Sequence, residues 1–126
     1  MATVLLYNFT DPQRRVKLLL CLRRLGLRAL EVAPEEQGRP LGSLLGLPGF
    51  ASGGAAEAPF TGEMLVMHAL GPEQFGALLD ALRRGGVPVA LKAVVTETNL
   101  AWSSARLHRE LAAEHAAMLA KARGRK

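Results

Sequence analysis

Two stretches of the chain share one pattern of apolar and polar positions. Residues 4–33 align with residues 64–93 without a gap, and each stretch begins with a short apolar run that leads into an amphipathic pattern. In each copy a proline opens the amphipathic segment, and a glycine follows a pair of arginines at its end, which are typical helix start and stop signals. The repeat therefore predicts two strand–helix–strand units. Identical pairs include Leu5/Leu65, Pro12/Pro72, Leu18/Leu78, Leu22/Leu82 and Gly26/Gly86.

The two predicted helices differ in the width of their apolar face. In the second copy Phe75, Leu78 and Leu82 recur at three- and four-residue spacing, which gives a single apolar stripe. The first helix adds three apolar residues to the equivalent stripe, namely Val16, Leu20 and Cys21. Its apolar face is thus wider than one sheet requires. We expect this helix to contact another helix or a partner chain as well as the sheet.

The remaining apolar runs predict four strands in one sheet. Residues 4–9 and 64–69 are mostly apolar without alternation, which is typical of central strands covered on both faces. Residues 27–33 and 87–95 are interrupted by charged side chains and are more typical of edge strands.

The linker and the C-terminal segment complete the expected single domain, residues 1–120. Residues 34–62 predict a short helix around 41–47 and then become rich in glycine. From Asn99 to about Lys121 a last helix is expected, with Leu107, Leu111 and Met118 on one face. This helix would cover the second face of the sheet. The basic end, residues 121–126, is predicted to be disordered.

Two folds accommodate this order of elements. If a two-fold axis relates the copies, their strands interleave antiparallel in a ferredoxin-like α+β sheet, with the first two long helices on one face and the last on the other. If residues 34–62 form a full crossover, all four strands run parallel in a small flavodoxin-like α/β sheet. The linker helix contains Gly42 and Gly46, which makes it a weak crossover. The ferredoxin-like arrangement is therefore favoured.

Several segments together are similar to a known family. They are VLLYNF, LGSLLGLPGF, EMLVM and GVPVALKAVVTETNLAW, with Glu114 and His115 late in the last helix. The chain resembles, from Val4 to about Met118, a family of small and mostly bacterial proteins catalogued as domain of unknown function 3783. The resemblance implies the fold and a cytosolic bacterial setting. It implies no activity, cofactor or catalytic residue.

Composition and charge exclude several classes of protein. The chain has 126 residues and a net charge of +5, but four of its 16 basic residues lie in residues 121–126, so the rest of the chain is nearly neutral. A basic tail of this kind disfavours nucleic acid as the main partner. A single cysteine, Cys21, rules out an internal disulfide framework. No apolar run approaches the length of a membrane span, so we expect a cytoplasmic protein.

The segment TETNLAW, residues 96–102, is more typical of a helix cap between a strand and the last helix than of a ligand site, but it is the main candidate for such a site. Thr98 or Asn99 is placed to cap the last helix, and Trp102 could fill a gap at the strand ends or contact a partner. In a parallel sheet this segment would meet the ends of both central strands and form a polar crevice. In a ferredoxin-like sheet Asn8 would instead lie at the opposite edge. The candidate ligand-binding residues are Asn8, His68, Thr96, Thr98, Asn99 and Trp102.

The sequence predicts no catalytic residue, cofactor or metal site. His68 has no serine, cysteine or carboxylate in a recognisable relation to it. His108 and His115 are two helical turns apart, about 10 Å, which is too far for both to reach one metal ion.

Three functions remain open. The favoured one is a non-catalytic binding or regulatory module that acts through a protein partner or self-association. The alternatives are a small-molecule binder or enzyme that uses the edge formed by His68 and residues 96–99, and a nucleic-acid binder that uses the basic tail.

Overall fold

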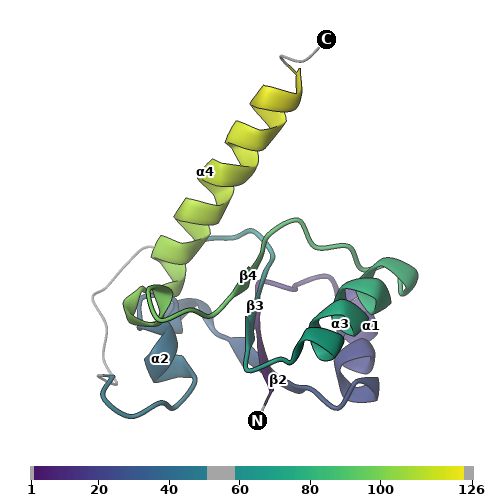
Figure 1. Ribbon diagram of the computed structural model, residues 1–126, viewed down its shortest axis with the longest axis horizontal. Helices are drawn as coiled ribbons and strands as arrows, with labels where there is room; N and C mark the ends of the chain where they lie inside the picture. The colour runs from purple at the N-terminus through teal and green to yellow at the C-terminus, as the bar shows by residue number, and fades with distance from the viewer. Residues whose placement is uncertain (1, 51–58, 124–126) are drawn as a thin grey trace. The chain divides into compact units, whose positions relative to one another are not determined.

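The computed structural model (Figure 1) describes residues 2–50 and 59–123. Contacts divide these residues into two compact units. The first contains all four strands with α1 and α3, and the second contains α2, α4 and two short 3-10 helices, η1 and η2. In chain order the elements are β1 (Thr3–Tyr7), α1 (Pro12–Arg24), β2 (Arg28–Val32), η1 (Pro34–Glu36), α2 (Leu41–Leu44), β3 (Met64–His68), α3 (Pro72–Arg84), β4 (Lys92–Val94), η2 (Asn99–Ala101) and α4 (Ser104–Arg123). The expected single domain over residues 1–120 stays a prediction.

The first unit is a four-stranded mixed sheet with the strand order β2-β1-β3-β4. Each βαβ unit keeps its two strands side by side and parallel, and the central strands β1 and β3 pair antiparallel. The prediction of an α+β fold built from two βαβ units is therefore confirmed. The two runs with charged interruptions are the edge strands, as expected.

The detailed strand order differs from both folds that the sequence suggested. A ferredoxin-like sheet interleaves the two units, whereas here only β1 and β3 join them. A flavodoxin-like sheet would be parallel throughout, and this sheet is not. The difference lies in where each crossover returns: α1 and α3 each bring the chain back directly beside the strand it left, with no strand between them. The two strands of each βαβ unit therefore pair with each other, and the two units are joined only through β1 and β3.

The pairing of the central strands follows the internal repeat. Leu5 pairs with Val66 and Leu6 pairs with Leu65. The alignment makes Leu5 equivalent to Leu65 and Leu6 equivalent to Val66, so each of these pairs becomes the other when the two copies are exchanged. The antiparallel ladder therefore has the two-fold symmetry that the repeat predicts. The gapless alignment fails only in β4. Leu5 pairs with Leu30, but Leu65 pairs with Lys92 rather than Ala90, so the paired strands are two residues further apart along the chain in the second unit.

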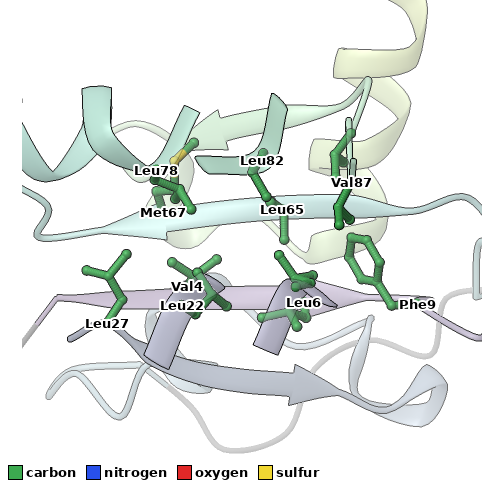
Figure 2. Packing of buried hydrophobic residues seen from close by; sticks show 12 residues of the cluster. Val4, Leu6, Phe9, Leu22, Leu27, Leu65, Met67, Leu78, Leu82 and Val87 are labelled. Carbon is green, nitrogen blue, oxygen red and sulfur yellow. The ribbon is translucent and has the colours of Figure 1, made fainter. Parts of the chain in front are cut away.

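One face of the sheet carries α1 and α3, which lie side by side (Figure 1). Each helix buries two leucines against this face, where they meet alternate residues of the central strands (Figure 2). The cluster comprises Val4, Leu6, Phe9, Leu18, Leu22, Leu27, Leu65, Met67, Leu78, Leu82, Val87 and Val89. The other set of alternate residues in β1 and β3 is also buried, except for the half-buried His68, as expected of central strands. That the last helix covers this second face stays a prediction.

Local signals in the sequence set the ends of α1 and α3. Asp11 Oδ1 accepts a hydrogen bond from the Gln13 N–H at 2.9 Å, which caps α1. The Gly71 N–H donates to Gln74 Oε1 at 3.0 Å at the start of α3. Both helices end at a glycine in the left-handed region, Gly26 at φ 70° and Gly86 at φ 71°. A residue with a Cβ would be strained at either position.

The second unit is organised around Gln37, whose side chain is fully buried. Gln37 Oε1 accepts a hydrogen bond from the Phe60 N–H at 3.0 Å, and the Gln37 backbone carbonyl accepts from the Ala105 N–H at 3.1 Å. The Leu41 N–H donates to the Trp102 carbonyl at 2.9 Å, so α2 is fixed to the segment before α4. The short helix predicted in the linker is thus confirmed.

The last helix begins and ends later than the sequence suggested. It starts at Ser104 instead of Asn99 and continues through Arg123, so residues 121–123 are helical rather than part of a disordered tail. Residues 51–58 of the glycine-rich linker and residues 124–126 of the basic end lie outside the described residues.

Candidate functional site

Two residues of the TETNLAW segment bond to each other. The Thr96 N–H donates to Asn99 Oδ1 at 2.8 Å, and the Asn99 N–H donates to Thr96 Oγ1 at 3.1 Å. This reciprocal pair closes the turn that leads into η2. Asn99 is 8% exposed, so it is buried among its own hydrogen-bond partners. A structural role accounts for these two side chains.

The helix cap was predicted at the wrong residue. Neither Thr98 nor Asn99 caps α4; Ser103 Oγ accepts a hydrogen bond from the Arg106 N–H at 3.1 Å. The chain first forms η2 and then extends through Trp102, at φ −80° and ψ 147°, before α4 begins. The serine pair at positions 103 and 104 is the signal in the sequence that marks this later start.

Trp102 contacts a cation of its own chain. The guanidinium carbon of Arg106 lies 4.1 Å from the centroid of the Trp102 ring, which is cation–π geometry. Trp102 is half-buried and Thr98 is exposed. Thr96, Glu97 and Ala101 are exposed as well, so much of the TETNLAW segment is accessible to solvent.

Asn8 and His68 do not share an edge of the sheet. Because β1 and β3 are antiparallel, Thr3 pairs with His68 at one end of the ladder and Tyr7, beside Asn8, pairs with Met64 at the other. Asn8 Nδ2 donates to the Gly62 carbonyl at 3.0 Å. The crevice that would have combined Asn8 with His68 is therefore not formed. Both residues belong to the first unit, whereas residues 96–102 belong to the second.

His108 is held against an aromatic ring. Its imidazole stacks on Phe60 with ring centroids 4.1 Å apart and an interplanar angle of 12°. Burial lowers the pKa of His108 from its ordinary value of 6.5, because desolvation penalises the charged imidazolium. Within residues 2–50 and 59–123 no group of three or more His, Cys, Asp or Glu residues could hold a metal ion.

The lowered pKa of His108 makes stability depend on pH. The unfolded chain binds a proton at His108 more readily than the folded chain does. The contribution of the buried, neutral imidazole to the free energy of unfolding is therefore fully present above pH 6.5 and is lost as the pH falls below that value. We expect the urea midpoint to fall between neutral and mildly acidic pH, and His108→Phe, which cannot titrate, to flatten the profile. A His108→Phe profile as steep as that of the native chain would contradict this origin of the pH dependence.

An apolar cavity of about 270 Å³ lies where β3 leads into α3. No pattern in the sequence indicates it, because its walls come from the end of β3, the loop, the start of α3 and the end of β4. Ala69 lies in the left-handed region at φ 62°, an uncommon conformation for a residue with a Cβ. The lining residues are Met67, Ala69, Leu70, Pro72, Phe75 and Val94. The cavity suits a small apolar group, and His68 does not line it.

The outer surface of α1 carries two exposed apolar side chains. Val16 is 52% exposed and Leu20 is 45% exposed. They lie one turn apart, next to Lys17 and the exposed arginines Arg23 and Arg24. We call these five residues the α1 surface. The sequence predicted that α1 has a wider apolar face than the sheet requires, and the exposure of Val16 and Leu20 shows which residues form the excess.

The repeat provides an internal comparison for the α1 surface. The positions equivalent to Val16 and Leu20 in α3 are Gly76 and Asp80. Packing on the sheet therefore does not require apolar residues at these positions. In α3, Asp80 forms ion pairs with Arg83 and with Arg84, the latter at 3.2 Å. In α1 the equivalent position is occupied by Leu20, which cannot form such an ion pair.

The fold and these surfaces define an α+β protein in which two βαβ units share one mixed sheet. Residues 63–118 match the model of a family described as Domain of unknown function (DUF3783). The resemblance that the sequence suggested from Val4 to about Met118 is thus confirmed over residues 63–118. This segment comprises the second βαβ unit, η2 and most of α4. No curated protein matches the chain, and no described helix is both long and apolar enough to span a lipid bilayer.

Proposed function

We propose that this protein is a non-catalytic binding module that uses the α1 surface to hold an acidic, amphipathic segment of a protein partner. The observation that carries the proposal is the contrast between the two repeats. Where α3 has Gly76 and Asp80, α1 has Val16 and Leu20, and the latter pair is exposed. The sheet does not use these side chains, and exposing them to water is unfavourable unless another surface covers them.

The charges beside Val16 and Leu20 indicate what kind of partner fits. Within α1, Arg14 bonds to Glu63, with its Nη2 at 2.7 Å from Glu63 Oε1, and Arg15 pairs with Glu31. The other three basic residues of the helix, Lys17, Arg23 and Arg24, form no ion pair within residues 2–50 and 59–123. The helix itself contains no Asp or Glu.

The missing acid explains why Arg23 and Arg24 form no ion pair in the described part of the chain. The arginines of α3 that are equivalent to Arg23 and Arg24 bond to Asp80, and Leu20 occupies the equivalent position in α1. A partner with leucine-like side chains would cover Val16 and Leu20, and carboxylates beside them would neutralise the arginines.

Other partners fit this surface less well. A second copy of α1 would bring Lys17, Arg23 and Arg24 against the same cations, and like charges oppose such a contact. A nucleic acid would neutralise the cations but would leave Val16 and Leu20 without apolar cover. The small-molecule site at residues 96–99 and nucleic-acid binding by the basic tail stay predictions.

Binding of a defined peptide tests the proposal. The probe is a labelled helical peptide with leucines along one face and glutamates on both sides of them, and fluorescence anisotropy measures its affinity. Val16→Ala combined with Leu20→Asp restores the internal acid of the other repeat. We expect this variant to weaken binding about tenfold or more, because it removes the apolar contact and neutralises the arginines internally.

The other repeat provides the matched control. Gly76→Val combined with Asp80→Leu transfers the surface to α3, and titration calorimetry of this variant should show two peptides bound instead of one. A scrambled peptide of the same composition should bind weakly. The proposal is wrong if the α1 variant binds as tightly as the native chain, or if single-stranded DNA binds the α1 surface and the peptide does not.

A further inference from the structure

The C-terminal part of α4 is exposed within the part of the chain that the structure describes. Residues 113–123 are all exposed, and Met118 and Leu119 keep 69% and 45% of their surface in contact with solvent. An isolated helix of this length is marginally stable in water, because few backbone hydrogen bonds offset the cost of nucleation. Earlier on the same helix Leu107 is buried, at 3% exposure. The face of α4 that is buried at Leu107 is therefore exposed to solvent from residue 113 towards Arg123.

The spacing of residues on this part of α4 is that of a helix that packs lengthwise against another helix. Leu111, His115, Met118 and Ala122 follow one another at intervals of four, three and four, which places them in a single seam. Glu114 and Lys121 border the seam on one side. Ala112 and Leu119 border it on the other. The outward side of this stretch is mainly alanine.

We infer that residues 111–122 of α4 pair antiparallel with the same residues of a second copy of this chain. One register places all four seam residues of each helix in contact with the seam of the partner helix. In it Leu111 packs against the partner's Ala122, and His115 packs against the partner's Met118. Each large side chain thus meets a smaller or flatter one, which allows the helices to approach closely. On the border, Leu119 meets the partner's Ala112.

The same register also pairs the charges. In an antiparallel pair Glu114 lies opposite the partner's Lys121, and Lys121 lies opposite the partner's Glu114. A parallel pair would instead place Glu114 beside the partner's Leu119 and His115 against the partner's His115. It would also bring both folded bodies to the same end of the helix pair. The antiparallel arrangement keeps them at opposite ends, separated by about 18 Å of paired helix.

Charge exchange in the full-length chain tests this arrangement. Glu114→Lys places lysines at both positions, and Lys121→Glu places glutamates at both. Each variant alone therefore puts like charges opposite each other across the pair. Sedimentation equilibrium should show a dimer for the native chain at micromolar concentration, and each variant should dissociate about tenfold or more readily.

Mixing the two variants distinguishes the register. An antiparallel heterodimer of Glu114→Lys with Lys121→Glu has opposite charges at every pair, so the equimolar mixture should regain the native dimer fraction. Ala113→Glu, on the opposite side of α4, should dimerise as the native chain does, and circular dichroism should show native helix content for all of these proteins. The inference is overturned if the native chain is monomeric throughout, if the single variants dimerise like it, or if the mixture behaves like its components.

Discussion

Leu18→Ala should lower the free energy of unfolding by about 2–5 kcal/mol, the range found for leucine truncations in well-packed interiors. Leu18 is fully buried between α1 and the sheet and belongs to the cluster in Figure 2. Truncation removes its apolar contacts and leaves a cavity that the helix cannot close, because Leu22 holds it at the next turn. Urea denaturation followed by circular dichroism measures the change.

The same helix provides the control for this prediction. Leu20→Ala alters an equally large side chain two positions away, but Leu20 is 45% exposed. Its loss should change the free energy of unfolding by less than about 0.5 kcal/mol, since alanine is also the better helix former. Equal destabilisation by the two substitutions would contradict both the packing of α1 and the proposal that Leu20 is available to a partner.

Gln37→Met is expected to destabilise the chain by about 1–3 kcal/mol. Methionine has nearly the volume of glutamine but cannot accept the hydrogen bond that the Phe60 N–H donates to Gln37 Oε1 at 3.0 Å. The Phe60 N–H would then be left without that acceptor, which costs more than the bond itself contributes. Thermal unfolding followed by circular dichroism measures the loss.

Two comparisons make the Gln37 prediction specific. Gln13→Met changes an exposed residue of α1 in the same way and should have little effect. The environment of His108 should also respond to Gln37→Met, because His108 stacks on Phe60. A shift of the His108 imidazole resonances in the NMR spectrum would report that displacement. Unchanged stability together with unchanged resonances would contradict the central role of Gln37 in the second unit.

The candidate ligand residues show which structural features a local sequence pattern can predict. The TETN segment was expected to cap the last helix; it forms a polar turn before that helix instead, because Thr and Asn side chains also bond to nearby backbone groups in turns. Its grouping with Asn8 and His68 depended on strand direction. Strand direction leaves no mark on the residues of a buried strand, since parallel and antiparallel ladders accept the same side chains. The antiparallel pairing of β1 with β3 separated those two residues.

The sequence by itself determined the elements and the faces of the first unit. Helix limits followed from Pro12, Pro72 and the two glycines that end the helices, because capping and left-handed turns are local requirements. The internal repeat determined the two βαβ units. The apolar periodicity also showed that α1 has more apolar surface than α3, since periodicity along a helix reports directly on its faces.

Only the tertiary structure decided the strand order, the partners of Gln37 and the cover of each apolar face. Gln37 is an unremarkable polar residue in a linker, and its burial follows from contacts with residues far along the chain. Whether Val16, Leu20 or Met118 is exposed likewise depends on what lies against it and not on its neighbours in sequence. The physical reason is that hydrogen bonding within a turn is a local property, whereas burial is a property of the whole packed arrangement.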